Sequence, residues 1–174
     1  MVIPRLSKTS DLDTVRGSIV KAVQSLGYRY PTKEQLEVAE KFVSGRDVFV
    51  SLPTGSGKSV CYACLPLVFD MLRDQRVHPS IVVVIAPLSA LMQDQVDSFN
   101  ARGLKSACIG LSVDSSASDD AVVRGEAQLV FTSPETLLSD STWRDMLRTR
   151  IYQENLVALA IDEAHLVEKW SVMY

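Results

Sequence analysis

The strongest chemical signal in the sequence is a short loop, rich in glycine and serine, that ends in a lysine. It reads Pro53-Thr54-Gly55-Ser56-Gly57-Lys58-Ser59. Glycines at two positions of this loop let the backbone amides turn inward and form a cradle for anions. In such a loop the lysine reaches the β- and γ-phosphates of a nucleotide, and the serine hydroxyl that follows it holds Mg²⁺. The full pattern begins with a glycine where this chain has Leu52, so an ordinary turn between a strand and a helix is the competing interpretation.

Two carboxylates farther along the chain are natural partners of this loop. Asp162 and Glu163 directly follow an apolar run over residues 156–161. In a nucleotide site, Asp162 would hold Mg²⁺, mostly through its water shell, and Glu163 would orient and deprotonate the attacking water. Acidic residues at the start of a short helix are also favourable for purely structural reasons. The presence of the upstream loop favours the nucleotide site.

The elements that must position these residues alternate between helices and strands. Helices are expected over residues 11–26 with Ser10 as the cap, and over 33–43, 59–73, 88–100, 133–138 and 142–150. Buried strands are expected over residues 48–52, 81–86, 106–109, 129–132 and 156–161, and a solvated loop over 112–120. This alternation predicts an α/β fold of three layers, with a mainly parallel sheet between helices. Ligands bind at the carboxyl ends of strands in such sheets, where the loop and the carboxylates would meet.

Composition and charge limit the class of protein. With 174 residues, 47% hydrophobic and 22% charged, the chain is expected to form one globular domain. Its net charge of -3 argues against a strongly basic surface for nucleic acid. No apolar run is long enough to span a membrane and no signal peptide is visible, so we expect an intracellular protein without membrane contact. Only residues 162–174 follow the last expected strand, which suggests the front part of a longer protein.

Several motifs together resemble those of superfamily 2 helicases, and of RecQ-type DNA helicases in particular. Asp162-Glu163-Ala164-His165 resembles the DEAH motif of the superfamily, in which the first glycine of the phosphate loop is commonly absent. The segment 86–96 is similar to motif Ia of RecQ helicases, Thr132-Ser133-Pro134-Glu135 to the next motif, and Leu26-Gly27-Tyr28 with Gln35 to motif 0. The resemblance implies a RecA-like P-loop NTPase domain. Residues 1–174 would then be the first motor lobe of a 3′-to-5′ helicase, truncated before the second lobe that supplies an arginine finger.

This resemblance implies ligands, partners and a biological role. ATP and Mg²⁺ are the expected cofactors, and DNA, as a single strand or a fork, is the expected partner. The role would be DNA repair and recombination, in the nucleus of a eukaryote or in the cytoplasm and nucleoid of a bacterium.

The resemblance also adds residues to the expected site. Tyr28 would offer a face to adenine and Gln35 an amide that pairs with it, although Tyr28 also fits a core aromatic and Gln35 also completes a capping box with Thr32. The expected nucleotide-binding set is Tyr28, Gln35, Thr54, Gly55, Ser56, Gly57, Lys58 and Ser59. His165 would bridge the nucleotide site to DNA. The expected DNA contacts are Pro87, Leu88, Ser89, Thr132, Ser133, Pro134 and Trp170, for which helix capping and core packing are the structural alternatives.

Two departures from the family pattern and two other functions complete the expectations. Thr32 stands where the family usually has an arginine, so adenine stacking is expected to be weaker. Residues 166–171 replace an aromatic-rich loop, so coupling to DNA is expected to differ. A nucleotide-binding module without unwinding activity is one alternative. A small P-loop kinase or another P-loop NTPase is the other, but the chain lacks the basic lid that a kinase would need. Cys61, Cys64 and Cys108 are expected to be buried small hydrophobic residues, not zinc ligands.

Overall fold

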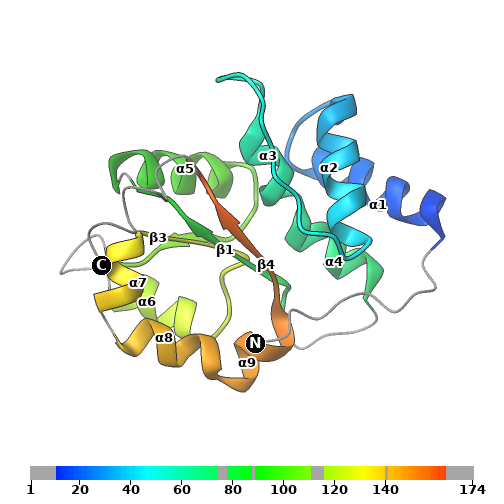
Figure 1. Ribbon diagram of the computed structural model, residues 1–174. Coiled ribbons are helices and arrows are strands. Elements are labelled where there is room, and N and C mark those ends of the chain that lie inside the picture. Colours follow the sequence, from blue (N-terminus) through cyan, green and yellow to red (C-terminus); the bar gives the residue numbers. More distant parts are fainter. Residues whose placement is uncertain (1–10, 74–77, 88, 111–115, 140, 164–174) are drawn as a thin grey trace.

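A parallel sheet lies between two layers of helices (Figure 1). The computed structural model describes residues 11–73, 78–87, 89–110, 116–139 and 141–163. The strands within these ranges are β1 (Ile81–Ile85), β2 (Ser106–Cys108), β3 (Leu129–Thr132) and β4 (Leu156–Ile161). Their order across the sheet is β2-β3-β1-β4, and every neighbouring pair is parallel. The expected three-layer α/β architecture is therefore confirmed.

The helices divide between the two faces of the sheet (Figure 1). One face is covered by α1 (Leu12–Ser25), α2 (Lys33–Val43), α3 (Lys58–Ala63), α4 (Leu65–Leu72) and α5 (Ser89–Ala101). The other is covered by α6 (Ser116–Val123), α7 (Pro134–Ser139), α8 (Ser141–Arg148) and α9 (Arg150–Asn155). Successive side chains of a strand point to opposite faces, so Val82 and Val84 pack into the first layer and Ile81 and Val83 into the second. Burial on both faces explains the uninterrupted apolar run of β1.

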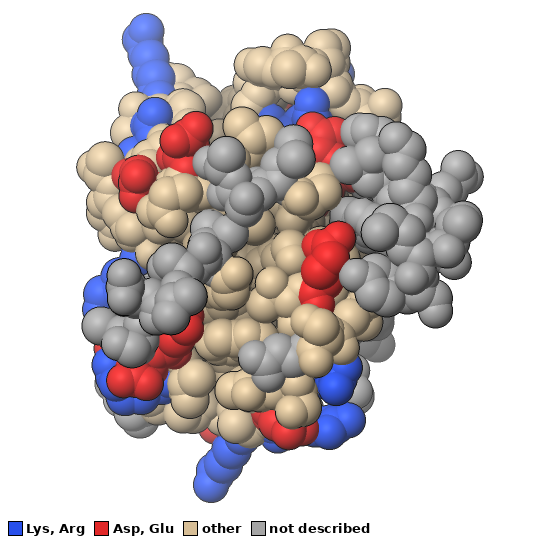
Figure 2. Space-filling view, turned by 90° about the vertical axis from the view of Figure 1, so that its left-hand side faces the viewer, with Lys and Arg blue, Asp and Glu red and all other residues tan. Residues whose placement is uncertain are grey.

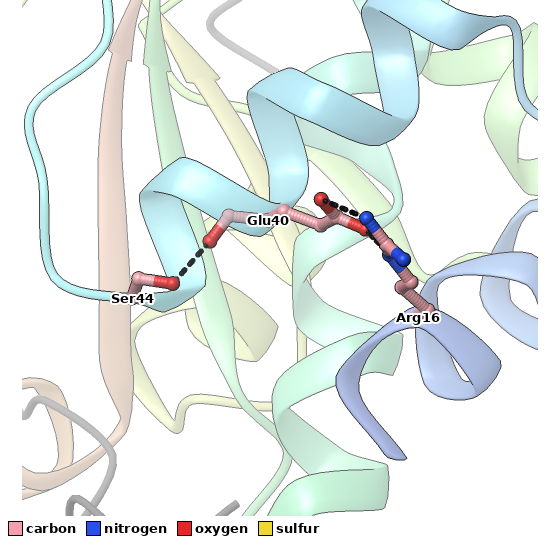
Figure 3. Close-up of polar contacts among 3 residues, drawn as sticks. All are labelled: Arg16, Glu40 and Ser44. Carbon is pink, nitrogen blue, oxygen red and sulfur yellow. Dashed lines mark hydrogen bonds and ion pairs between the residues drawn. The ribbon is translucent and has the colours of Figure 1, made fainter. Parts of the chain in front are cut away.

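An ion pair joins α1 to α2 on the surface (Figure 3). The Arg16 guanidinium donates through Nε to Glu40 Oε1, and its Nη2 lies 3.5 Å from Glu40 Oε2. At the end of α2, the Ser44 hydroxyl donates to the backbone carbonyl of Glu40 at 2.7 Å. Because the arginine is half exposed, we expect the pair to add at most about 1 kcal/mol to stability. These contacts help to orient α2, whose first turn reaches the phosphate loop.

The prediction of a buried strand over residues 48–52 is wrong. These residues form no strand; Val48, Val50 and Leu52 are half-buried, and the side chain of Phe49 is 83% exposed. Within the described residues β4 pairs only with β1, and a cavity lies between its other edge and residues 48–52. An apolar run predicts burial, but a strand also requires a backbone partner. No described segment supplies that partner.

Smaller differences also have local causes. The helix expected over 59–73 is divided at Cys64 into α3 and α4, because Pro66 in the first turn of α4 has no amide to continue the ladder. The loop expected over 112–120 contains the start of α6, which is held by the fully buried Val122. The cap of α1 is Asp11, and Ser10 lies outside the described residues. None of the described helices has the length and apolar character that a membrane span requires.

Candidate functional site

The phosphate loop adopts the backbone conformation that its glycines predict. Gly55 and Gly57 have φ values of 80° and 77°, in the left-handed region that favours glycine. Gly57 is the N-cap of α3, and a Cβ atom there would lie 2.7 Å from Gln35 Nε2. Only glycine therefore fits this position without moving a neighbour. The loop between residues 53 and 58 is closed by a hydrogen bond from the Ser56 hydroxyl to the Pro53 carbonyl at 2.7 Å.

Lys58 occupies the first position of α3 and points back across the loop. Its Nζ donates to the backbone carbonyls of Leu52 at 3.0 Å and Pro53 at 3.2 Å. Both acceptors are neutral, so an anion in the cradle would compete with them for the ammonium group. The Lys58 side chain is thus held beside the loop in which it is predicted to bind phosphate.

The two carboxylates follow β4 at the carboxyl edge of the sheet. The register places Ile161 beside Ile85, and the Asp162 amide donates to the Ile85 carbonyl at 2.9 Å. The Asp162 Oδ1 accepts the Glu163 amide at 3.0 Å. Glu163 has a φ of 55°, which a residue with a side chain adopts rarely. Such backbone conformations are concentrated at functional sites, and this one turns the chain sharply directly after Asp162.

A cavity of about 590 Å³ brings the two sequence motifs together. Thr54 and Lys58 from the loop and Asp162 and Glu163 from the end of β4 all line it. Most of the remaining lining is apolar and comes from residues 48–52 and from β4. The fold thus places a cation, a potential metal ligand and a potential base around one space that a ligand could enter.

Tyr62 is a residue beside the candidate site that the sequence reasoning missed. It lies one turn after Lys58 on α3, and its hydroxyl donates to Gln95 Oε1 at 2.6 Å and lies 3.3 Å from Asp162 Oδ2. Burial, reinforced by the charge of Asp162, raises the pKa of Tyr62 far above the usual range, so the phenol stays protonated. Its position one helical turn from the lysine was the available signal in the sequence.

The residues present fit a magnesium ion. Ser59 lies in the first turn of α3, and the hydroxyl of Tyr62 on the same helix lies 3.3 Å from Asp162 Oδ2, so the two expected ligands come from segments that are in contact. A hydroxyl and a carboxylate are hard oxygen donors of the kind Mg²⁺ prefers. We therefore keep Ser59 and Asp162 as the predicted metal ligands.

Gln35 takes the structural role that the sequence left open, and it also contacts the phosphate loop. Its backbone amide donates to the Thr32 hydroxyl at 3.2 Å and its Oε1 accepts the Thr32 amide at 3.0 Å, which confirms the capping box. Its Nε2 donates to the Gly57 carbonyl at 3.1 Å. Both ends of the buried amide therefore have partners, and pairing with adenine would require their exchange. This adenine contact stays a prediction.

Tyr28 lies at the surface and is not a buried core aromatic. Its side chain is 36% exposed, and the Arg102 guanidinium carbon lies 4.6 Å from the ring centroid. Arg102 also donates to the Leu26 carbonyl at 2.8 Å, which anchors it there. The arginine covers one face of the ring, so an adenine would have to stack on the other face.

The expected DNA contacts follow β1 and β3 at the same edge of the sheet as Asp162. Ile85 is level with Thr132, and the Ala86 amide donates to the Thr132 carbonyl at 3.0 Å. The Thr132 side chain is fully buried, and the Ser133 hydroxyl accepts the Thr136 amide at 3.1 Å, which is the capping role named as the alternative. Pro134 is also buried, whereas Pro87 is half-buried. Contact with DNA stays a prediction for these residues.

Four expected site residues cannot be placed. Leu88, His165 and Trp170 lie outside the described residues, and the side chain of Ser89 is not described although its backbone begins α5. Ala164, the remaining member of the DEAH motif, is also outside them.

The described surface on one side of the molecule has no continuous basic patch. Figure 2 shows Lys and Arg side chains at separate places on this face, with Asp and Glu between them. This agrees with the net charge of -3.

The three cysteines are buried, as expected from the sequence. Burial raises the pKa of the Cys61 thiol to about 11 and those of Cys64 and Cys108 to about 12. A thiol in such surroundings is a poor nucleophile and packs as a small apolar side chain.

Comparisons with known proteins agree with the geometry of the site. The family model described as "DEAD/DEAH box helicase" matches residues 32–173. The chain is 32% identical over 170 residues to the ATP-dependent DNA helicase RecQ of Haemophilus influenzae, covering 96% of this chain and 25% of that protein. It is 35% identical to the ATP-dependent DNA helicase RecQ of Synechocystis, in an alignment that covers 82% of this chain and 27% of that protein. It is 34% identical to the ATP-dependent helicase SGS1 of Saccharomyces cerevisiae, in an alignment that covers 78% of this chain and 9% of that protein. The chain thus spans about a quarter of the length of these bacterial relatives.

Proposed function

This chain belongs to the DEAD/DEAH box helicase family, and on that premise we propose that it is the ATP-binding first lobe of a RecQ-type DNA helicase. The whole protein would couple ATP hydrolysis to 3′-to-5′ unwinding of DNA in repair and recombination. It would act in the compartment that holds the chromosome, which is the nucleus of a eukaryote or the cytoplasm of a bacterium. Family membership argues against the small P-loop kinase.

One observation carries the proposal. Tyr62, on the helix that opens with Lys58, and Asp162 are 100 residues apart in the chain, yet their side chains are in contact. Lys58, Asp162 and Glu163 line the same cavity as a result. A nucleotide site needs these three groups around one phosphate chain, and the fold gathers them at the edge of a parallel sheet where ligands bind.

The residues divide the chemistry of hydrolysis between them. The amides of the loop and the Lys58 ammonium would bind the phosphates, after Lys58 leaves the carbonyls of Leu52 and Pro53. Ser59 and Asp162 would hold Mg²⁺, which neutralises charge on the phosphate oxygens when it is bound. Glu163 would take a proton from a water molecule while the oxygen of that water attacks the γ-phosphorus and the bond from this phosphorus to ADP breaks. The second lobe of the whole protein would add the arginine finger.

The test is nucleotide binding by the purified 174-residue chain. Binding of a fluorescent ATP analogue would be measured with Mg²⁺ for the wild type and for Lys58→Ala. Loss of a charge-assisted contact worth about 1.5–3 kcal/mol should weaken binding roughly 10- to 100-fold. Lys21→Ala removes an exposed lysine of α1 and is the matched control. Equal affinities for the wild type and Lys58→Ala would show that the loop is only a turn.

Unwinding itself requires the protein with its second lobe. We expect that protein to separate a duplex that carries a 3′ single-stranded tail, and to lose this activity with Lys58→Ala. The 174-residue chain alone should bind ATP weakly, hydrolyse it slowly and not unwind, because closing motions between lobes convert hydrolysis into movement. Rapid DNA-stimulated unwinding by this chain alone would contradict the assignment to a single lobe.

A further inference from the structure

We propose that Tyr62 is the positioning residue for the magnesium-binding carboxylate of Asp162, and that Gln95 holds Tyr62 in place for this role. The inference rests on the proposed function, because it concerns the metal ligand of the nucleotide site. It adds two side chains to that site, one from near the end of α3 and one from α5. Neither belongs to the loop or the carboxylate pair that the sequence identifies.

The geometry around the phenol carries the proposal. The Tyr62 hydroxyl has one proton, which two acceptors share, and Gln95 Oε1 at 2.6 Å is the closer of them. The second acceptor, Asp162 Oδ2, lies 3.3 Å from the same hydroxyl. Tyr62 therefore lies where α3, α5 and the end of β4 converge, in contact with the predicted metal ligand Asp162.

Two sets of contacts fix the position of the phenol. Its ring packs edge-on against Phe131 of β3, with centroids 6.4 Å apart and ring planes at 75°. Its hydroxyl is held by Gln95, which is half-buried on the inner side of α5. Because a ring and a hydroxyl are anchored separately, Phe at this position would keep the packing and lose only the polar contacts.

The carboxylate of Asp162 is oriented from two sides as a result. Its Oδ1 accepts the Glu163 amide at 3.0 Å, and its Oδ2 faces the Tyr62 hydroxyl. Partners of this kind fix the orientation of a metal ligand, and removing one typically costs affinity for the metal. Gln95 also connects this carboxylate to α5, which begins at Ser89, directly after the turn predicted to contact DNA. The Tyr62 hydroxyl thus links Asp162 to α5, the helix that follows the predicted DNA contacts.

The experiment measures Mg²⁺ affinity through nucleotide binding, without using turnover. The 174-residue chain would be titrated with a fluorescent ATP analogue in EDTA and then at increasing Mg²⁺. For Tyr62→Phe we expect the Mg²⁺ concentration at half-maximal enhancement to rise about tenfold, with unchanged binding in EDTA. Gln95→Ala should shift the midpoint in the same direction by a smaller factor. The double variant should match Tyr62→Phe, because both residues act through one hydroxyl.

Matched controls separate positioning from general damage. Tyr30→Phe removes the hydroxyl of an exposed tyrosine, and Gln93→Ala removes an exposed glutamine of α5 whose amide donates to Asp97. Both should titrate like the wild type. A wild-type midpoint for Tyr62→Phe, or an equal loss of binding in EDTA and in Mg²⁺, would overturn the inference alone. Absence of any Mg²⁺-dependent binding in the wild type would overturn the proposed function, and this inference with it.

Discussion

The contact between the phosphate loop and Gln35 can be tested by placing one methyl group at each of two loop glycines. Gly55→Ala and Gly57→Ala both force a side chain into the left-handed region, at φ values of 80° and 77°. The two sites differ in their neighbours. A Cβ at Gly55 meets nothing within 4 Å, whereas a Cβ at Gly57 would lie 2.7 Å from Gln35 Nε2.

The expected magnitudes follow from these neighbours. The backbone conformation alone costs about 1–2 kcal/mol for a residue with a side chain, so Gly55→Ala should lower the free energy of unfolding by that amount. Gly57→Ala should lose the same amount and also the hydrogen bond from Gln35 Nε2 to the Gly57 carbonyl, worth about 0.5–1.5 kcal/mol. The reduced entropy of the unfolded chain affects both variants equally and does not change the difference between them.

Urea unfolding of the purified chain at 25 °C is the assay, and the difference between the two variants is the quantity that matters. Gln35→Ala combined with Gly57→Ala should cost less than the sum of the single variants, because the clash is absent when the amide is removed. Equal destabilisation by Gly55→Ala and Gly57→Ala, or full additivity in the double variant, would refute the contact between Gln35 and the loop.

Three further outcomes are expected. Glu163→Gln should keep nucleotide binding and lower hydrolysis by the whole protein about 10²- to 10⁴-fold in a phosphate-release assay, since an amide takes no proton from water; unchanged turnover would assign the base elsewhere. Phe131→Ala, at a fully buried position, should lower the free energy of urea unfolding by about 3–5 kcal/mol, and Phe49→Ala, at a side chain 83% exposed, by less than about 0.5 kcal/mol. A large loss at Phe49 would show that residues 48–52 are buried after all. The three buried cysteines should react with a thiol reagent at pH 8 only after unfolding, because their pKa values of about 11 to 12 keep them protonated. Because these thiols lose their protons more readily in the unfolded chain than in the folded one, the free energy of unfolding should fall as the pH rises above the ordinary thiol pKa, at about pH 9. Rapid labelling of the folded chain would contradict their burial.

Local sequence was sufficient for elements whose signals lie within a few residues. The helix α2 has the predicted bounds, because Thr32 and Gln35 form its capping box and Gly45 follows its end with a φ of 87°. The strands β3 and β4 also have the predicted bounds, because each is a short apolar run; β3 is buried throughout, whereas β4 is buried only in its first half. The phosphate loop and the acidic pair were recognised in the same way, because side-chain type and spacing alone define them.

Tertiary structure decided everything that depends on a partner distant in the chain. Residues 48–52 have the composition of a strand, but hydrogen-bonding partners determine whether a strand forms, and none lies beside them in the described structure. The role of Gln35 at the loop depends on the approach of α2 to Gly57. The contact of Tyr62 with Asp162 arises only when α3 packs beside the end of β4, 100 residues farther along the chain. A sequence records the chemistry that each side chain can perform, whereas the packing of distant segments determines which side chains meet.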